Sequence, residues 1–289
     1  LRLVLELLKH YTLNYSNNIK MNEIEKLSEK IEKEALIRLH KHCSDEAAQA
    51  LGRKMLEIGD VVAAAAVNDP SVVINRTLGL GTKNKVSLKS LSDIKKFYND
   101  LGIKKYFTHI YPEELPENGK AMLDELGFQQ SRGWMKFKRD NSPTPQAPTE
   151  LDIREASSAE QALHFGRIVA NAFGMTELSA PMLAGLVNDP KWHIFSSYSG
   201  DSPAGAGAMY VSGESAWIEW GATDPDFRRQ GSQAAIMSAR IQKAIDLGCK
   251  HMFTETGEAV EGDPQHSYKN ILKAGFTESV LRDNYSPKT

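Results

Sequence analysis

An internal repeat limits the folds open to this chain. The segment LGIKKYFT at 101–108 returns as LGCKHMFT at 247–254, with Leu, Gly, Lys, Phe and Thr at the same places. An amphipathic helical pattern precedes each copy, and a glycine after such a pattern is a typical helix stop. We therefore expect a helix, a glycine stop and a strand in each half of the chain.

The residues after each copy extend the repeat. The segments at 122–128 and 270–276 have the pattern of short helices that end in Gly-Phe, and strand patterns follow at 131–138 and 279–285. The same order of helix, strand, helix, Gly-Phe and strand in both halves predicts an internal duplication.

A proline-rich segment separates the two halves. NSPTPQAPTE at 141–150 contains three prolines and cannot continue a helix or a central strand. We interpret it as an interdomain linker between a first lobe at 22–140 and a second lobe at 151–289. Residues 1–21 are expected to be an N-terminal extension, and their leucine-rich, charged start lacks a convincing signal-peptide pattern.

The element order predicts the fold class. The second half has a strand at 151–156, helices at 159–173 and 177–187, and three hairpin-linked strands at 192–199, 204–212 and 216–223, before the repeated portion. The first half has a helical entry at 22–58 and a hairpin formed by 59–67 and 71–81. We expect an α/β (α+β) fold of two lobes, each with a mixed, mostly antiparallel sheet flanked by helices.

Composition narrows the partners and the compartment. Lys and Arg number 35 against 37 Asp and Glu, a net charge of -2 that argues against a nucleic-acid or membrane partner. The two cysteines, Cys43 and Cys249, have no metal-type spacing and predict a reducing, cytoplasmic environment. His251 and His266 lack the partner spacing of a metal site, so no metal is expected.

The stretch FRRQGSQAA at 227–235 is a candidate anion site. It lies between the predicted strand at 216–223 and a helix that begins near Gly231. The first turn of a helix exposes unpaired N–H groups, and a glycine there lets a phosphate approach the backbone. Arg228 and Arg229 can add charge-assisted hydrogen bonds, and Ser232 a hydroxyl. The alternative is a surface helix with two solvated arginines near its start.

In this order of elements, the stretch resembles the acyl-coenzyme-A-binding motif of the GNAT superfamily of acetyltransferases, Q/R-x-x-G-x-G/A. Arg228 and Gly231 match the motif, whereas Gln233 departs from its usual small residue. Asp224-Pro225 and the segment SYKNILKAGF at 267–276 extend the resemblance, which covers 151–289. The first half has no Arg-x-x-Gly, and therefore resembles a degenerate lobe that lacks the cofactor loop.

The resemblance implies an N-acetyltransferase that uses acetyl-coenzyme A as cosubstrate and no metal. Pantetheine would pair with the backbone at the end of the strand 216–223, and the diphosphate would meet the N–H groups that follow. The implied cofactor-binding residues are Ala222, Thr223, Arg228, Arg229, Gln230, Gly231, Ser232, Gln233, Ala234, Ser267 and Asn270.

Acetyl transfer to an amine needs a base, because primary amines are protonated near neutral pH. Glu219, in the strand before the cofactor loop, is the first candidate, and Glu255 at the end of the next strand is the second. The alternative for Glu219 is a paired or solvated carboxylate, and the alternative for Glu255 is a surface charge at the end of a strand. Ile271 stands where many family members have a tyrosine acid, so Tyr268 is the candidate acid, with core packing as its alternative.

The resemblance implies transfer of an acetyl group to a primary amine of a small molecule or a protein, within a ternary complex. The acceptor is expected in a crevice between the lobes, where some tryptophans would form its walls. Two alternatives stay open: a non-catalytic acyl-coenzyme-A sensor, and a transferase that uses another acyl donor. The oligomeric state, monomer or homodimer, is open.

Overall fold

A computed structural model describes residues 21–83 and 85–288. The helices are α2 (Glu23–Lys41), α3 (Asp45–Leu51), α4 (Leu88–Asp100), α5 (Gly119–Glu125), α6 (Ala159–Ala172), α7 (Ser179–Ala184), α8 (Ser232–Asp246) and α9 (His266–Lys273). The strands of the first half are β1 (Arg53–Ile58), β2 (Val61–Ala66), β3 (Arg76–Leu80), β4 (Phe107–Ile110) and β5 (Phe128–Arg139). Those of the second are β6 (Asp152–Glu155), β7 (Trp192–Ser199), β8 (Ser202–Ser212), β9 (Ser215–Thr223), β10 (His251–Gly257) and β11 (Thr277–Pro287).

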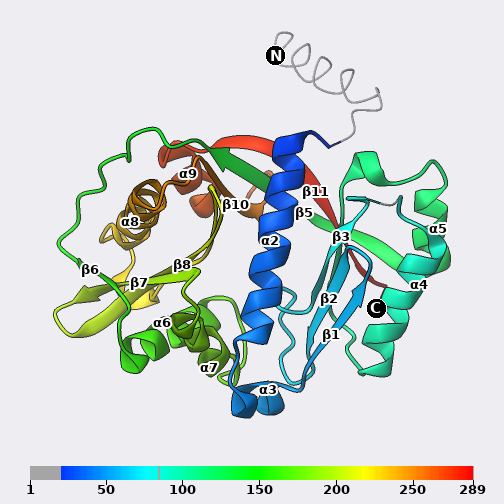
Figure 1. The fold of residues 1–289 in the computed structure, drawn as a ribbon, viewed down its shortest axis with the longest axis horizontal. Helices are drawn as coiled ribbons and strands as arrows, with labels where there is room; N and C mark the ends of the chain where they lie inside the picture. The colour runs from blue at the N-terminus through cyan, green and yellow to red at the C-terminus, as the bar shows by residue number, and fades with distance from the viewer. Residues whose placement is uncertain (1–20, 84, 289) are drawn as a thin grey trace, which may run out of the picture.

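The predicted fold class is confirmed: one large mixed sheet carries helices on its faces (Figure 1). Strands β7, β8 and β9 form the expected antiparallel hairpins, and β9 and β10 are parallel. None of the helices described is long and apolar enough to cross a membrane. The predicted extension at 1–21 lies outside the described residues, except for the buried Met21.

The predicted helical entry at 22–58 is wrong in its last part. Helix α3 ends before Gly52, which adopts a left-handed conformation with φ 61°. The next six residues form β1, and Ile58 pairs with Val61 across a tight turn. An extended strand forms here instead of a helix because the backbone conformation of Gly52 ends the helix and β2 supplies a hydrogen-bonding partner.

The two halves share a single sheet because they exchange their last strands. The strand order is β1-β2-β3-β4-β11-β5-β10-β9-β8-β7-β6. Strand β5 of the first half pairs with β10 of the second, while β11 of the second half pairs with β4 of the first. The predicted boundary at 141–150 therefore divides the sequence and leaves the sheet continuous.

The strand register follows the sequence repeat. Glu255 pairs with Lys136, and its repeat counterpart His109 pairs with Asn284, the counterpart of Lys136. A duplication would produce this correspondence. The duplication itself remains a prediction.

Helices pack on both faces of the sheet at the centre of the molecule. Helix α2 runs across the middle, between the strands of the two halves (Figure 1). Its buried residues Ile31, Ala35 and Leu39 share a core with α6, α7 and one face of β7–β9. Met237 and Ile241 of α8 belong to a separate core that also includes α9. The start of β10 thus lies between two helical layers.

Candidate active site

A cavity lies where β9 and β10 part. The two strands pair in parallel from Ser215 and His251 as far as Trp217 and Phe253. The rest of β9 then pairs with β8 alone, and the rest of β10 pairs with β5. The space between them forms a cavity of about 280 Å³.

The cavity reaches both faces of the sheet. On one side, which we call the α8 side, its walls are Gln233, Met237, Ser267, Asn270 and Ile271 of α8 and α9. On the other, the Arg76 side, they are Val73, Arg76, Trp134 and Phe173. Both halves of the chain therefore contribute to one cavity, with the strand residues Ile218–Gly221 and Thr254–Gly257 between the two sides.

A bulge in β9 shapes the cavity wall. Glu219 pairs with Ala208 and Ala222 pairs with Ala206, so Trp220 and Gly221 together lie opposite Gly207. Trp220 has φ 60°, a conformation that is rare for a large side chain. Bulges leave backbone groups without ladder partners and re-aim side chains, and they concentrate near functional sites.

Arg240, which the sequence analysis did not single out, supports this bulge from α8. Its side chain is buried, and its Nη1 donates to the carbonyl oxygens of Ala208 at 3.1 Å and of Glu219 at 2.8 Å. Burial lowers the pKa of Arg240 to about 9. Its position among Met237, Ile241 and Ala244 on the buried helix face was the available sequence signal.

Glu219, the first predicted base, lies in the cavity wall and turns toward the Arg76 side. Trp217 Nε1 donates to its Oε2 at 2.9 Å, and Arg76 Nη2 lies 3.8 Å from the same oxygen. Burial raises the pKa of Glu219 to about 7, although Arg76 and the Trp217 hydrogen bond oppose the rise. A carboxyl group with this pKa can accept and release a proton near neutral pH.

Glu255, the second predicted base, lines the same cavity but has more partners. Its Oε1 accepts from Arg76 Nη1 at 3.1 Å, and its Oε2 accepts from Arg282 Nη2 at 2.8 Å. Burial raises the pKa of Glu255, against the effect of Arg282. The structure thus brings both predicted carboxylates together, with Glu219 the less constrained of the two.

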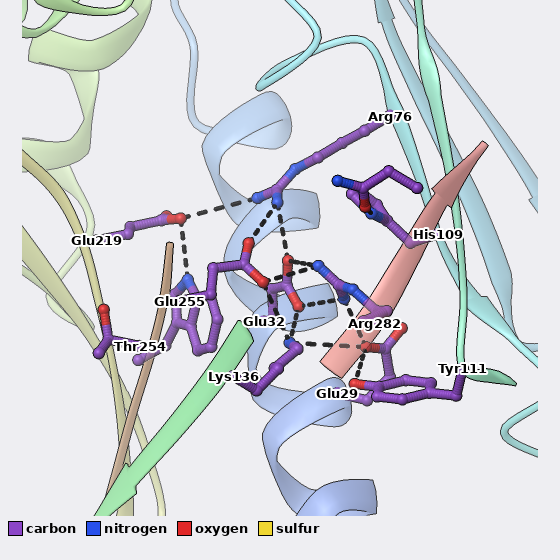
Figure 2. Close-up of polar contacts among 12 residues, drawn as sticks. Glu29, Glu32, Arg76, His109, Tyr111, Lys136, Glu219, Thr254, Glu255 and Arg282 are labelled. Carbon is purple, nitrogen blue, oxygen red and sulfur yellow. Dashed lines mark hydrogen bonds and ion pairs between the residues drawn. The ribbon is translucent and has the colours of Figure 1, made fainter. Parts of the chain in front are cut away.

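Behind these carboxylates lies a buried charge network that sequence reasoning missed (Figure 2). Within the described residues it comprises Glu29 and Glu32 of α2, Arg76 of β3, Lys136 of β5, Glu219 of β9, Glu255 of β10 and Arg282 of β11. Glu32 is central: Arg76 Nη1 donates to it at 2.8 Å, and Lys136 and Arg282 also bond to it. Burial alone would raise the pKa of Glu32, but Arg282, Lys136 and Arg76 hold it well below its usual range.

A sequence signal for this network existed. Arg76, Lys136 and Arg282 interrupt apolar strand patterns, and charged residues are rarely buried without partners. Their partners come from distant parts of the chain, so the pairing itself was not visible in the sequence.

The predicted cofactor loop has an irregular backbone before α8. A short 3-10 turn at Pro225–Phe227 leads to Arg229 with φ 65° and Gly231 with φ 83°. Gly231 caps α8 without a side-chain hydrogen bond from the described residues. The exposed Arg228, Arg229, Gln230 and Ala234 surround this first turn. Uncapped N–H groups beside two arginines fit an anionic group.

The glycine at 231 also has a structural cause. Its positive φ favours glycine, and a Cβ there would lie 3.1 Å from the carbonyl oxygen of Pro148. The segment at 141–150 thus packs against the loop, and Thr149 Oγ1 donates to the Gln230 carbonyl at 2.6 Å.

Other predicted cofactor residues fall into two groups. The Gln233 side chain accepts from Asn270 Nδ2 at 2.7 Å, and both line the α8 side of the cavity with Ser267. The Ser232 hydroxyl instead is buried and hydrogen-bonded to Ser197 Oγ at 2.8 Å. The group of Ser232 that could contact an anion at the loop is therefore its backbone N–H. Ala222 and Thr223 lie at the end of β9, where they pair with β8.

Tyr268 does not reach the cavity. Its hydroxyl donates to Glu278 Oε1 at 2.5 Å, and its ring packs edge-on against Phe137. Helix α9 turns Ser267, Asn270 and Ile271 toward the cavity instead. The expectation that Tyr268 faces the cofactor is therefore not met. Among the residues that the structure describes, no group of His, Cys, Asp or Glu is arranged to hold a metal.

Comparison with solved structures places this architecture among known folds. A GCN5-related N-acetyltransferase from Kribbella flavida superposes with a TM-score of 0.62 at 14% identity, over 91% of this chain and 96% of that one. A GCN5-related N-acetyltransferase from Sphaerobacter thermophilus gives a TM-score of 0.54 at 13% identity, over 80% and 81% of the two chains. No protein-family model and no curated protein matches the sequence. The chain therefore has the GNAT fold.

Proposed function

We propose that this protein transfers an acetyl group from acetyl-coenzyme A to a primary amine. The observation that carries this proposal is the cavity between β9 and β10, which passes through the sheet and has Glu219 in its wall. A cosubstrate on the α8 side and an acceptor on the Arg76 side would meet beside this carboxylate. The GNAT fold of the chain supports the same reaction class.

The residues present fit the cosubstrate. The uncapped first turn of α8, with Arg228 and Arg229 beside it, suits a diphosphate. Pantetheine would follow the end of β9 at Ala222 and Thr223, and then pass Gln233, Ser267 and Asn270. Acetyl-coenzyme A supplies the activated acyl group when it is bound.

This chain's residues would then manage the charges of the transfer. Glu219 takes the proton of the acceptor ammonium, directly or through a water molecule, because its pKa is raised to about 7 by burial. Backbone N–H groups that the bulge at Trp220 and Gly221 frees from the ladder stabilise negative charge on the carbonyl oxygen. Arg76 limits how far the pKa of Glu219 rises.

We propose further that the cofactor site belongs to the second half alone. In the first half, β3 and β4 remain paired from Arg76 and Phe107 to Leu80 and Ile110, although the register shifts. The Tyr98 hydroxyl donates to the Ala64 carbonyl at 2.9 Å, and its ring stacks on Tyr106 beside these strands. This packing leaves the first half to shape the acceptor side.

The test is an acetyl-transfer assay that measures free coenzyme A with a panel of primary amines, beside calorimetric titration with coenzyme A. The proposal expects saturable coenzyme A binding and amine-dependent release of thiol. Binding of acetyl-coenzyme A without release on any amine would instead favour a sensor.

The sensor is a second candidate because of one observation. Tyr268 is held by Glu278 outside the cavity, so it cannot protonate a leaving thiolate there. Transfer would then need a water molecule, or the cationic nitrogen of the tetrahedral intermediate, as the acid. Competition between acetyl-coenzyme A and longer acyl-coenzyme A donors distinguishes the acetyltransferase and the sensor from a transferase that uses another acyl donor.

A further inference from the structure

We propose that the Arg76 side of the cavity takes a small primary amine with a single positive charge and an apolar body. This inference rests on the proposed function and names the class of its acceptor.

The walls fit an apolar body of limited size. Trp134, Phe173, Trp217 and Trp220 line the cavity together with Val73, and Phe173 packs edge-on against Trp220 with ring centroids 5.6 Å apart. The volume of about 280 Å³ is close to the lower end for ligand sites, and the end of the cosubstrate must share it. Little space is left for a large or polar acceptor.

Two of these aromatic rings already have a cation of the protein over them. Lys136 Nζ lies 4.5 Å from the centroid of the Trp217 ring, and the Arg76 guanidinium lies 5.7 Å from that of Trp134. Phe173 and Trp220 also line the cavity, and the acceptor would pack against the parts of their rings that face it. An aliphatic or aromatic body fits there by apolar burial.

The charge network has one acid more than it has bases. Among the described residues, four carboxylates (Glu29, Glu32, Glu219 and Glu255) meet three cations (Arg76, Lys136 and Arg282). His109 adds no charge, because burial holds its pKa well below the ordinary value. Arg240 also lines the cavity from the α8 side, where it hydrogen-bonds to carbonyl oxygens and its charge interacts with Glu219. Glu219 itself has an ion-pair contact with Arg76 at 3.8 Å, so an acceptor ammonium beside it would supply a closer cation.

A substrate carboxylate finds no uncommitted cation there. Arg76 Nη1 donates to both Glu32 and Glu255, Lys136 is bonded to Glu32, and Arg282 bonds to Glu29, Glu32 and Glu255. Arg76 Nε and Trp220 Nε1 are buried without a partner among the described residues, and Arg76 Nη2 lies 3.8 Å from Glu219 Oε2, so these are the donors that an amino-acid substrate could use. Any such carboxylate would also lie beside the negative charge of Glu219 and Glu255.

A second ammonium is equally poorly matched. The acidic residues that line the cavity in the described part of the chain are Glu219 and Glu255, and two guanidinium groups already bond to Glu255. The second cation of a diamine would be desolvated among aromatic rings without a carboxylate. A monoamine avoids this cost.

The test measures amine binding without the cosubstrate, by the intrinsic fluorescence of the tryptophans that line the cavity. The probes are 2-phenylethylamine, its neutral analogue 2-phenylethanol, phenylalanine and 1,4-diaminobutane. At pH 8 we expect 2-phenylethylamine to bind at least about tenfold tighter than each of the others, as loss of a charge-assisted hydrogen bond or burial of an unpaired charge predicts. Equal binding of the alcohol, or tighter binding of the amino acid or the diamine, overturns the inference.

Two further measurements sharpen this test. Lowering the pH from 8 to 6 protonates Glu219, so the preference for the amine over the alcohol should shrink; Arg76, Glu32, Glu255 and Arg240 are the charged groups that face or influence it. Glu219→Gln should abolish that preference, whereas Glu214→Gln, in the exposed turn before β9, should keep it. Retention of the full preference in Glu219→Gln overturns the inference.

The outcomes separate this inference from the proposed function. Selective binding of the monoamine without acetyl transfer would support the inference and contradict the transferase. Acetyl transfer with a preference for diamines or amino acids would support the transferase and contradict the inference.

Discussion

At the scale of single residues, three carboxylates of one network have different partners and therefore different acidities. Glu32 has three cations, which hold its pKa well below the ordinary value despite its burial. Glu255 has two guanidinium partners and Lys136 Nζ at 3.7 Å. Glu219 has an indole N–H and one cation at 3.8 Å, and burial raises its pKa to about 7. This difference in partners selects Glu219 as the proton acceptor.

Glu219→Gln should lower kcat for acetyl transfer by about 10²–10⁴-fold, the usual contribution of a general base. The wild-type rate should fall below about pH 7, where Glu219 is protonated, and the variant should lose that inflection. Coenzyme A affinity should stay within a factor of about two, since Glu219 turns toward the Arg76 side. Steady-state kinetics across pH, with Glu214→Gln as the control, checks this. An unchanged rate and pH profile in the variant would show that Glu219 is not the general base.

The same substitution predicts a pH-dependent gain in stability. The pKa of Glu219 rises from 4.5 to about 7 on folding, so the folded state binds an extra proton between these values. Stability from this group is complete below pH 4.5 and is lost as the pH rises through 7. Glutamine does not titrate. As the pH rises from 5 to 8, the free energy of unfolding of the variant should therefore increase by roughly 1–3 kcal/mol relative to that of the wild type. Urea unfolding at both pH values measures the change, and a difference that does not vary with pH would contradict the raised pKa.

At the scale of elements, the site depends on the bulge in β9 and on the first turn of α8. The hairpins, α8 and its loop follow from sequence patterns, since alternation and the arginine-glycine spacing are local. The bulge could not be predicted, because AWIEWGAT alternates regularly and the irregularity appears only in its pairing with β8. β1 was missed for a related reason: six residues between two turns became a strand because β2 was available as a partner.

Gln233→Glu tests whether the first turn of α8 binds an anion. The substitution retains an oxygen that can accept from Asn270 and adds a negative charge at the start of the helix. We expect coenzyme A affinity to fall by about tenfold or more, because like charges a few ångströms apart repel strongly at a partly buried site. Gln242→Glu, exposed farther along the same helix, adds the same charge away from the loop and should bind normally. Equal coenzyme A affinities of the two variants in a calorimetric titration would show that the diphosphate binds elsewhere.

At the scale of the whole molecule, the exchanged strands make the two halves one folding unit. The repeat at 101–108 and 247–254 predicted related elements in each half, but the exchange was not predictable because strand neighbours far apart in sequence leave no local pattern. The buried network follows from the exchange: β5 brings Lys136 against Glu255, and β11 brings Arg282 to α2. Tertiary pairing, rather than any local signal, determines that these charges are buried.

The second half should therefore not fold by itself. A chain of residues 151–289 lacks β5, which leaves β10 and β11 with exposed edges and deprives Glu255 of Lys136 and Arg282 of Glu32. Circular dichroism and gel filtration should show an unfolded or aggregated chain. Co-expression with residues 21–150 should restore a soluble complex, and a cooperatively folding monomer of 151–289 alone would contradict this account.

The central claim is that the gap between β9 and β10 holds the acyl end of coenzyme A beside Glu219. A crystal structure with acetyl-coenzyme A tests it most directly. The account predicts the diphosphate at the backbone N–H groups of 229–234 and the thioester in the cavity next to the bulge at Trp220. A ligand bound in the first half, or one that leaves this gap empty, would contradict it.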